Sequence, residues 1–235
     1  PRRGPVVPSY VAAAQAPLLF MPIRSGPEYA VQNWLASLDE NSVSALQTGF
    51  NQKTLRQWKR DHVGHRTFTV VRHPAARLHE AFCSKILTTG PGSFAKIRNT
   101  LRKFHKLPIP GQEPNENWDL AAHREAFIAF AQFVKMNLSG QTSIRVDAHW
   151  CSQAQAISNM AEFALPDMVV REDQMAEMLP ILAISAGVEA PQIPDLTPED
   201  PLFFNLADIY DAEVADAVQD AYQRDYLMFG FESWA

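Results

Sequence analysis

The sequence has few cysteines and no long apolar run. Its 235 residues include only Cys83 and Cys151, too few for a disulfide framework. No stretch approaches the roughly 20 apolar residues that a membrane helix requires. The first residues are basic, but prolines interrupt residues 5–16, so the start does not match a signal peptide. We therefore expect a cytoplasmic protein without a membrane span.

Metal-binding spacings and an excess of positive charge are also missing. No cysteine and histidine grouping has the spacing of a zinc site, so no metal is expected, and Cys83 is expected to be a core residue. The formal net charge of −5 argues against general nucleic-acid binding. One segment, residues 96–106, is basic without an acid. Such a segment is usually a solvated helix face, and the alternative is the border of a site for an anion.

The length and composition suit a globular core. With 46% hydrophobic and 20% charged residues, the chain resembles an ordinary folded protein. We expect residues 1–235 to form a single domain, or a piece of a longer chain. Residues 120–138 give the clearest helical pattern, with apolar residues on one face that we expect in the core.

A strand, a turn and a helix follow one another in residues 67–86. Residues 67–71 are β-branched or aromatic, as in a buried strand, and Pro74 suits the first turn of a helix. Arg72 stands at the carboxyl end of the strand, where ligands bind in open α/β sheets. The pattern predicts a phosphate or sulfate site with Arg72 and Arg77. The alternative is an arginine that pairs with a carboxylate at the sheet edge.

An earlier segment has the same layout. Residues 18–23 form an apolar run, a turn containing Arg24, Ser25 and Gly26 follows, and residues 28–38 have helical spacing. This is the layout of a loop that cradles a phosphate.

The two apolar runs predict the central architecture. We expect Leu18–Met21 and Phe68–Val71 to be parallel strands of one sheet, with Arg24 and Arg72 near the same edge. His62 and His65 precede the second strand. Either one is a candidate base for removing a hydroxyl proton, and the alternative is two exposed histidines in a basic loop.

Several segments, in this order, resemble those of sulfotransferases that use 3′-phosphoadenylyl sulfate. The similarity is greatest to the carbohydrate sulfotransferases and the bacterial nodulation-type enzymes. The similar segments are residues 24–28, 71–85, 147–153, 165–172 and 221–231. The resemblance implies an α/β fold like that of P-loop kinases, with a parallel sheet flanked by helices.

The resemblance also assigns cofactor-binding roles. It implies that Arg72 and Arg77 bind the 3′-phosphate of 3′-phosphoadenylyl sulfate, with Glu80 at the position of the family's serine. A second set, in the first turn, would hold the 5′-phosphosulfate; its members are Arg24, Ser25 and Gly26. Arg24 takes the place of the family's lysine, which stabilises charge on the bridging oxygen.

The segment at residues 147–153 adds a candidate catalytic base. It is similar to the family's Asp-x-His-Trp pattern, so the resemblance implies that His149 accepts the proton, oriented by Asp147, while Trp150 walls a nucleotide or sugar pocket. His62 and His65 remain alternatives. The implied partners are the nucleotide donor and a saccharide acceptor.

Two departures from the family pattern leave the activity open. Glu28 and Glu80 each stand where the family has a hydroxyl residue, and a carboxylate repels a phosphate. The favoured function is sulfuryl transfer to a saccharide hydroxyl. The rival is a non-catalytic domain that serves interaction or support, and a third possibility is a neutral or cationic nucleotide-like ligand.

Overall fold

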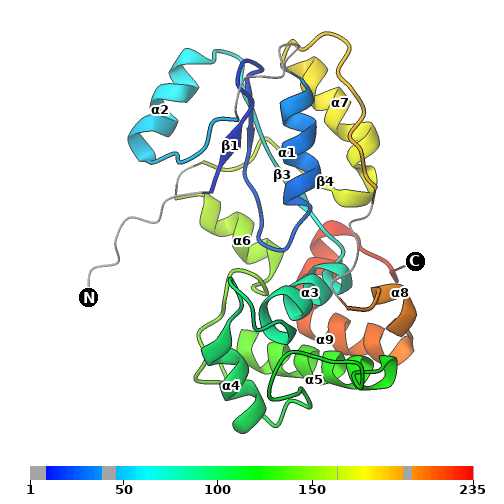
Figure 1. The fold of residues 1–235 in the computed structure, drawn as a ribbon. Coiled ribbons are helices and arrows are strands. Elements are labelled where there is room, and N and C mark those ends of the chain that lie inside the picture. The colour runs from blue at the N-terminus through cyan, green and yellow to red at the C-terminus, as the bar shows by residue number, and fades with distance from the viewer. Residues whose placement is uncertain (1–8, 39–45, 163, 198–202, 235) are drawn as a thin grey trace. The chain divides into compact units, whose positions relative to one another are not determined.

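The computed structural model describes residues 9–38, 46–162, 164–197 and 203–234 (Figure 1). The first residues, on which the expected lack of a signal peptide partly depends, lie outside these ranges. The chain divides into two compact units. The first unit comprises Pro1–Arg72 with Ala156–Pro198, and the second comprises His73–Gln155 with Glu199–Ala235.

The first unit contains a four-stranded sheet in the order β1-β2-β3-β4. Its strands are Val11–Ala12, Leu18–Phe20, Arg66–Val71 and Met168–Arg171. β2, β3 and β4 are parallel neighbours, whereas β1 pairs with β2 in the antiparallel direction. The α/β fold with parallel strands is therefore confirmed, and β1 is an antiparallel addition at one edge.

Helices of the first unit flank this sheet (Figure 1). They are α1 (Glu28–Ser37), α2 (Gln52–Asp61), the 3₁₀ helix η2 (Glu172–Gln174) and α7 (Met175–Ser185). α1 and α7 bury apolar side chains against Phe20, Phe68 and Val170 of the strands. This shared core stabilises the packing of the helices against the sheet.

A hydrogen-bonded pair of residues, Thr67 and Asp167, lies at the starts of β3 and β4. Asp167 Oδ2 accepts hydrogen bonds from the backbone N–H and the hydroxyl of Thr67, at 2.7 and 2.9 Å. Because Asp167 precedes β4 and Thr67 lies at the start of β3, this contact holds the two strands in register.

The second unit is helical. Its elements are α3 (Pro74–Ala81), the π-helical segment η1 (Phe82–Leu87), α4 (Ala95–Lys103), α5 (Leu120–Leu138), α8 (Leu206–Ile209) and α9 (Ala212–Phe229). α6 (Gln153–Met160) begins in this unit and ends in the first. α5 spans the range that its periodicity predicts, and it packs against α9. Its apolar face lies in the core, as predicted.

The basic segment of residues 96–106 is exposed to solvent only in part. Arg98 is only 2% exposed, and its guanidinium donates to the carbonyls of residues 86 and 110–112. It thereby fixes the proline-rich loop that follows α4. Lys96, Lys103 and Lys106 are exposed, as a solvated face requires. No helix within the described ranges is long and apolar enough to cross a membrane.

Candidate functional site

Three parallel strands of the first unit end at one edge of the sheet. β2 runs into the turn containing Arg24, β3 is followed by Arg72, and β4 is followed by Glu172. Arg72 Nη1 donates to the backbone carbonyl of Ser25 at 3.5 Å, which links the first two turns. Arg24 and Arg72 therefore lie near the same edge, as the sequence predicts.

The turn before α1 has a backbone shape that requires glycine. The Gly26 N–H donates to the Ile23 carbonyl at 3.0 Å, and a Cβ on Gly26 would lie only 2.7 Å from that oxygen. Ser25 adopts a φ of 59°, in the left-handed region. In the described part of the chain, no side chain caps the N-terminus of α1, which begins after Pro27. The positive end of the helix dipole thus adjoins this turn, as in anion-binding loops.

Arg72 forms a two-pronged ion pair with Glu172. Its Nε and Nη2 donate to the two carboxylate oxygens at 2.7 and 2.8 Å, and the side chains are 24% and 29% exposed. Parallel bonds of this kind are among the stronger charge-assisted contacts. The pairing is the one that the alternative interpretation of Arg72 anticipates.

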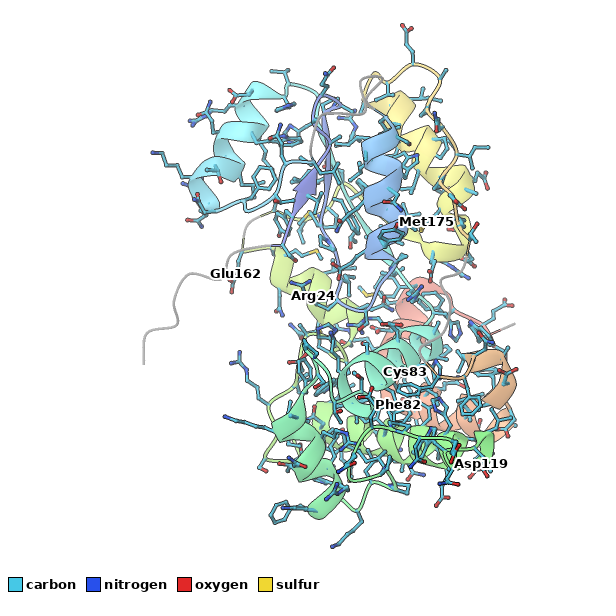
Figure 2. All side chains as sticks on the ribbon, viewed as in Figure 1. Arg24, Phe82, Cys83, Asp119, Glu162 and Met175 are labelled. Atoms are coloured by element: carbon cyan, nitrogen blue, oxygen red, sulfur yellow. The ribbon has the colours of Figure 1, made fainter. Side chains whose placement is uncertain are left out.

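A second, weaker pair lies beside the turn. Arg24 Nη1 and Glu28 Oε2 are 3.5 Å apart, with side-chain exposures of 45% and 26%, so the contact contributes little. Figure 2 labels Arg24 in the segment between β2 and α1. The edge thus carries two arginines, each beside a glutamate, and the positive charge expected for an anion site is largely compensated.

His62 and His65 are not brought together with Arg72. Their Nδ1 atoms lie 2.8 and 3.0 Å from the carbonyls of Trp58 and His62, and a carbonyl only accepts, so each Nδ1 carries the proton. Both rings contact Trp58. They precede β3, whereas Arg72 follows it, and six strand residues span about 20 Å.

Arg77 lies in the second unit and is buried. Its Nη1 and Nη2 donate to the carbonyls of Cys151 and Ala148 at 2.6 and 2.9 Å, and it is 1% exposed. The guanidinium therefore supports the chain around residues 148–151. Glu80, from the same helix, is exposed. The roles of both residues toward a 3′-phosphate stay predictions.

His149 stands in a turn that Asp147 organises. Asp147 Oδ1 accepts from the backbone N–H of His149 at 2.9 Å, and the His149 ring packs edge-on against Phe94. Trp150 is fully buried, and its indole N–H donates to Asn137. It is therefore part of the core and does not line an open pocket.

The C-terminal segment that resembles the family pattern holds this same region. The Tyr222 hydroxyl donates to the Trp150 carbonyl at 2.7 Å. The Asp225 carboxylate accepts from the backbone N–H groups of Gln153 and Ala154 at 2.7 and 3.0 Å. Burial raises the pKa of Asp225, and these hydrogen bonds oppose that rise. The sequence marks both residues through the resemblance, but it does not reveal which backbone atoms they contact.

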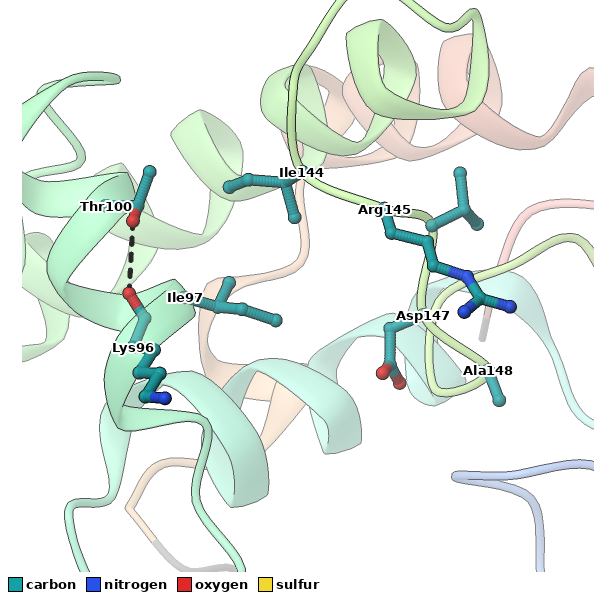
Figure 3. Close-up of a pocket in the computed structure, with 8 residues that line it drawn as sticks. Lys96, Ile97, Thr100, Ile144, Arg145, Asp147 and Ala148 are labelled. Carbon is teal, nitrogen blue, oxygen red and sulfur yellow. Dashed lines mark hydrogen bonds between the residues drawn. The ribbon is translucent and has the colours of Figure 1, made fainter. Parts of the chain in front are cut away.

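A groove of about 560 Å³ borders the turn (Figure 3). Residues of α4 form one side and residues 144–148 the other. Lys96 and Arg145 bring positive charge to it, Asp147 brings one carboxylate, and Ile97 with Ile144 contributes apolar surface. It offers room and mixed polarity for a small polar molecule.

Comparison with known proteins gives one match. The sequence model described as the Sulfotransferase family matches residues 27–232, which is most of the chain. No curated protein and no solved structure gives a significant match.

Proposed function

The chain belongs to the sulfotransferase family, and from this premise we propose that it transfers a sulfuryl group from 3′-phosphoadenylyl sulfate to a saccharide hydroxyl. The observation that carries the proposal is the turn at Gly26, which leads into an uncapped helix N-terminus beside Arg72 in the described part of the chain. The start of α1 would present the positive end of the helix dipole to a phosphosulfate.

The first unit would bind the nucleotide donor. The Gly26 turn and the start of α1 would hold the 5′-phosphosulfate. Arg24, which is 45% exposed at its side chain, would stabilise the charge that builds on the bridging oxygen. Arg72 would hold the 3′-phosphate. To bind there, the phosphate must displace the Glu172 carboxylate from the Arg72 guanidinium.

The second unit would receive the acceptor. The saccharide class, of the carbohydrate or nodulation type, is supported by the similarity of residues 147–153. The groove beside that segment gives the acceptor a place within the unit, with Lys96 and Arg145 as donors toward its oxygens. His149 is the proposed base, since His62 and His65 lie at the far end of β3 from Arg72.

A specific observation favours a second candidate function. Both arginines at the sheet edge already contact a carboxylate, and the Arg72 pair is two-pronged. These ion pairs are compatible with a sulfotransferase-like domain that has lost catalysis and serves interaction or support, because such a domain does not need the arginines to bind a phosphate. Under that alternative, no donor binds.

Radiolabelled donor tests the proposal directly. The purified chain is incubated with 3′-phosphoadenylyl sulfate carrying labelled sulfur and a panel of neutral and acidic oligosaccharides. We expect label in a saccharide product, a large loss of rate in Arg24→Ala, and no change in Arg60→Ala, which alters an exposed helical arginine elsewhere in the first unit. Absence of label in every product would favour the non-catalytic candidate.

A further inference from the structure

Two histidines and a cysteine converge in the core of the second unit. His79 and Cys83 lie on successive turns of the α3–η1 helix, and His123 lies on α5. The Nε2 atoms of the two histidines are 2.9 Å apart, and Cys83 Sγ is 3.7 Å from His79 Nε2. All three potential ligand atoms lie within 4.8 Å of one another.

The three residues are buried: His79 is 8% exposed, Cys83 4% and His123 0%. Figure 2 labels Cys83 next to Phe82, where the π-helical segment begins. The ring of Phe127 lies edge-on to His79, and the ring of Phe82 lies edge-on to His123. Sequence spacing does not suggest this grouping, because His123 is separated from the pair by a helix and a long loop.

The distance between Cys83 Sγ and His79 Nε2 suits a tetrahedral metal ion. With Zn–N near 2.05 Å and Zn–S near 2.3 Å, two nitrogen ligands lie about 3.3 Å apart and a nitrogen and a sulfur about 3.6 Å apart. The observed separation of 3.7 Å between Cys83 Sγ and His79 Nε2 already matches the second value. The two imidazole nitrogens would have to separate by about 0.4 Å to match the first.

The donor set also selects the kind of metal. Two imidazoles and one thiolate are soft or borderline ligands, which favour zinc over magnesium or calcium. Burial, and for His79 also the neighbouring His123, lowers the pKa of His79 to about 3, and burial lowers that of His123 to about 4.

Cys83 is a thiol until a cation arrives. Burial first, and then the charge of Glu80, raises the pKa of Cys83. Binding of Zn²⁺ would displace the thiol proton to solvent and form the Zn–S bond, because a coordinating thiol is deprotonated outright. Zn²⁺ bound by one thiolate and two neutral imidazoles has a net charge of +1, and the negative charge of Glu80 would partly offset this positive charge.

The local backbone supplies an independent indication. The helix changes from α to π at Phe82, so Cys83 lies in the first turn of a six-residue π segment. Short π segments inside helices occur frequently at functional sites. This one directs the thiol toward His79 in the preceding turn.

We propose that His79, Cys83 and His123 form a buried zinc-binding site, with the fourth coordination position open to water or a small ligand. The site would join the α3–η1 helix to α5 and so stabilise the second unit. It is independent of the proposed transfer reaction.

Trp118 provides a readout for occupancy. Its indole N–H donates to His123 Nδ1 at 3.2 Å, and an indole nitrogen only donates. In the metal-free protein, the His123 proton is therefore on Nε2, from which it donates to His79. A metal on Nε2 moves that proton to Nδ1, and the bond from Trp118 must break.

Cobalt substitution tests the site, because Co²⁺ bound by a thiolate gives a near-ultraviolet charge-transfer band. We expect one Co²⁺ per chain with this band, displacement of the band by Zn²⁺, and a higher unfolding temperature with Zn²⁺. Cys83→Ser should abolish the band. Cys151→Ser, which alters the chain's other cysteine, and His105→Asn, which alters another histidine of the second unit, should retain it.

The parent protein decides the question even where a variant folds poorly. The indole N–H resonance of Trp118, assigned with Trp118→Phe, should shift when one equivalent of Zn²⁺ is added. A band that survives in Cys83→Ser would overturn the proposal. So would a parent that shows no band, no Trp118 shift and no thermal stabilisation, in which case the three residues form a hydrogen-bonded core cluster only.

Discussion

Arg72 and Glu172 meet in a two-pronged ion pair at 2.7 and 2.8 Å, although 100 residues separate them in the chain. Each follows one of two neighbouring parallel strands, β3 and β4. The Glu172 carboxylate thus orients the Arg72 guanidinium, and it also occupies the N–H groups that a phosphate would need. Ligand binding at this edge depends on how readily a phosphate replaces the carboxylate.

Glu172→Gln should strengthen binding of adenosine 3′,5′-bisphosphate. The amide keeps the size of the side chain but removes the competing charge, and we expect a gain of about 1 kcal/mol. Titration calorimetry measures it, with Asp173→Asn as the control, because Asp173 pairs with Arg171 and not with Arg72. A weaker complex would instead identify Glu172 as the group that orients Arg72.

Gly26→Ala should damage the turn before α1. The new Cβ would lie 2.7 Å from the Ile23 carbonyl, so the backbone must shift, and we expect a loss of stability of about 1–3 kcal/mol. Urea unfolding measures the loss. Gly90→Ala is the control, because its Cβ would meet nothing closer than 3.7 Å. Equal stabilities for the two variants would mean that the turn does not constrain residue 26.

Replacing the two carboxylates at family hydroxyl positions should improve donor binding. Glu28→Thr and Glu80→Ser each remove a negative charge and add a hydroxyl. The double variant should bind adenosine 3′,5′-bisphosphate more tightly, and the gain should be greater at low salt because ions screen charge repulsion. Glu213→Thr with Glu177→Ser, which removes two carboxylates of other helices, controls for net charge. If the double variant matches the parent, these carboxylates do not limit binding.

Tyr222→Phe should destabilise the chain by about 1–3 kcal/mol. The substitution leaves the Trp150 carbonyl without its buried donor, which lies at 2.7 Å. Denaturant unfolding of Tyr222→Phe against Tyr29→Phe, an exposed tyrosine, isolates the effect. A difference near zero would mean that water replaces the hydroxyl.

Much of the fold is predictable because its signals are local. The bounds of α5 follow from helical periodicity, and the strands β2 and β3 follow from short apolar runs before a turn. Parallel pairing of these strands then places Arg24 and Arg72 at one edge. Each step needs only neighbouring residues and general rules of α/β sheets.

The partners of the charged residues are not local and could not be predicted. Arg77 lies in the segment predicted to bind a phosphate, and Arg98 lies in the basic segment of residues 96–106. Both are nevertheless buried and donate to backbone carbonyls. Nothing in residues near Arg72 identifies Glu172 as its partner. The grouping of His79 with His123 likewise depends on how α3 and α5 pack.

The measurement that tests the central claim most directly is calorimetry of adenosine 3′,5′-bisphosphate with the parent, Arg72→Ala and Arg66→Ala. Arg66 begins β3 and Arg72 directly follows its last residue, so Arg66→Ala removes the same charge at the opposite end of the strand from the proposed site. We expect the parent and Arg66→Ala to bind equally, and Arg72→Ala to lose about 2–5 kcal/mol of binding free energy. Equal affinities in all three proteins, or no binding by the parent, would contradict a donor site at this edge of the sheet.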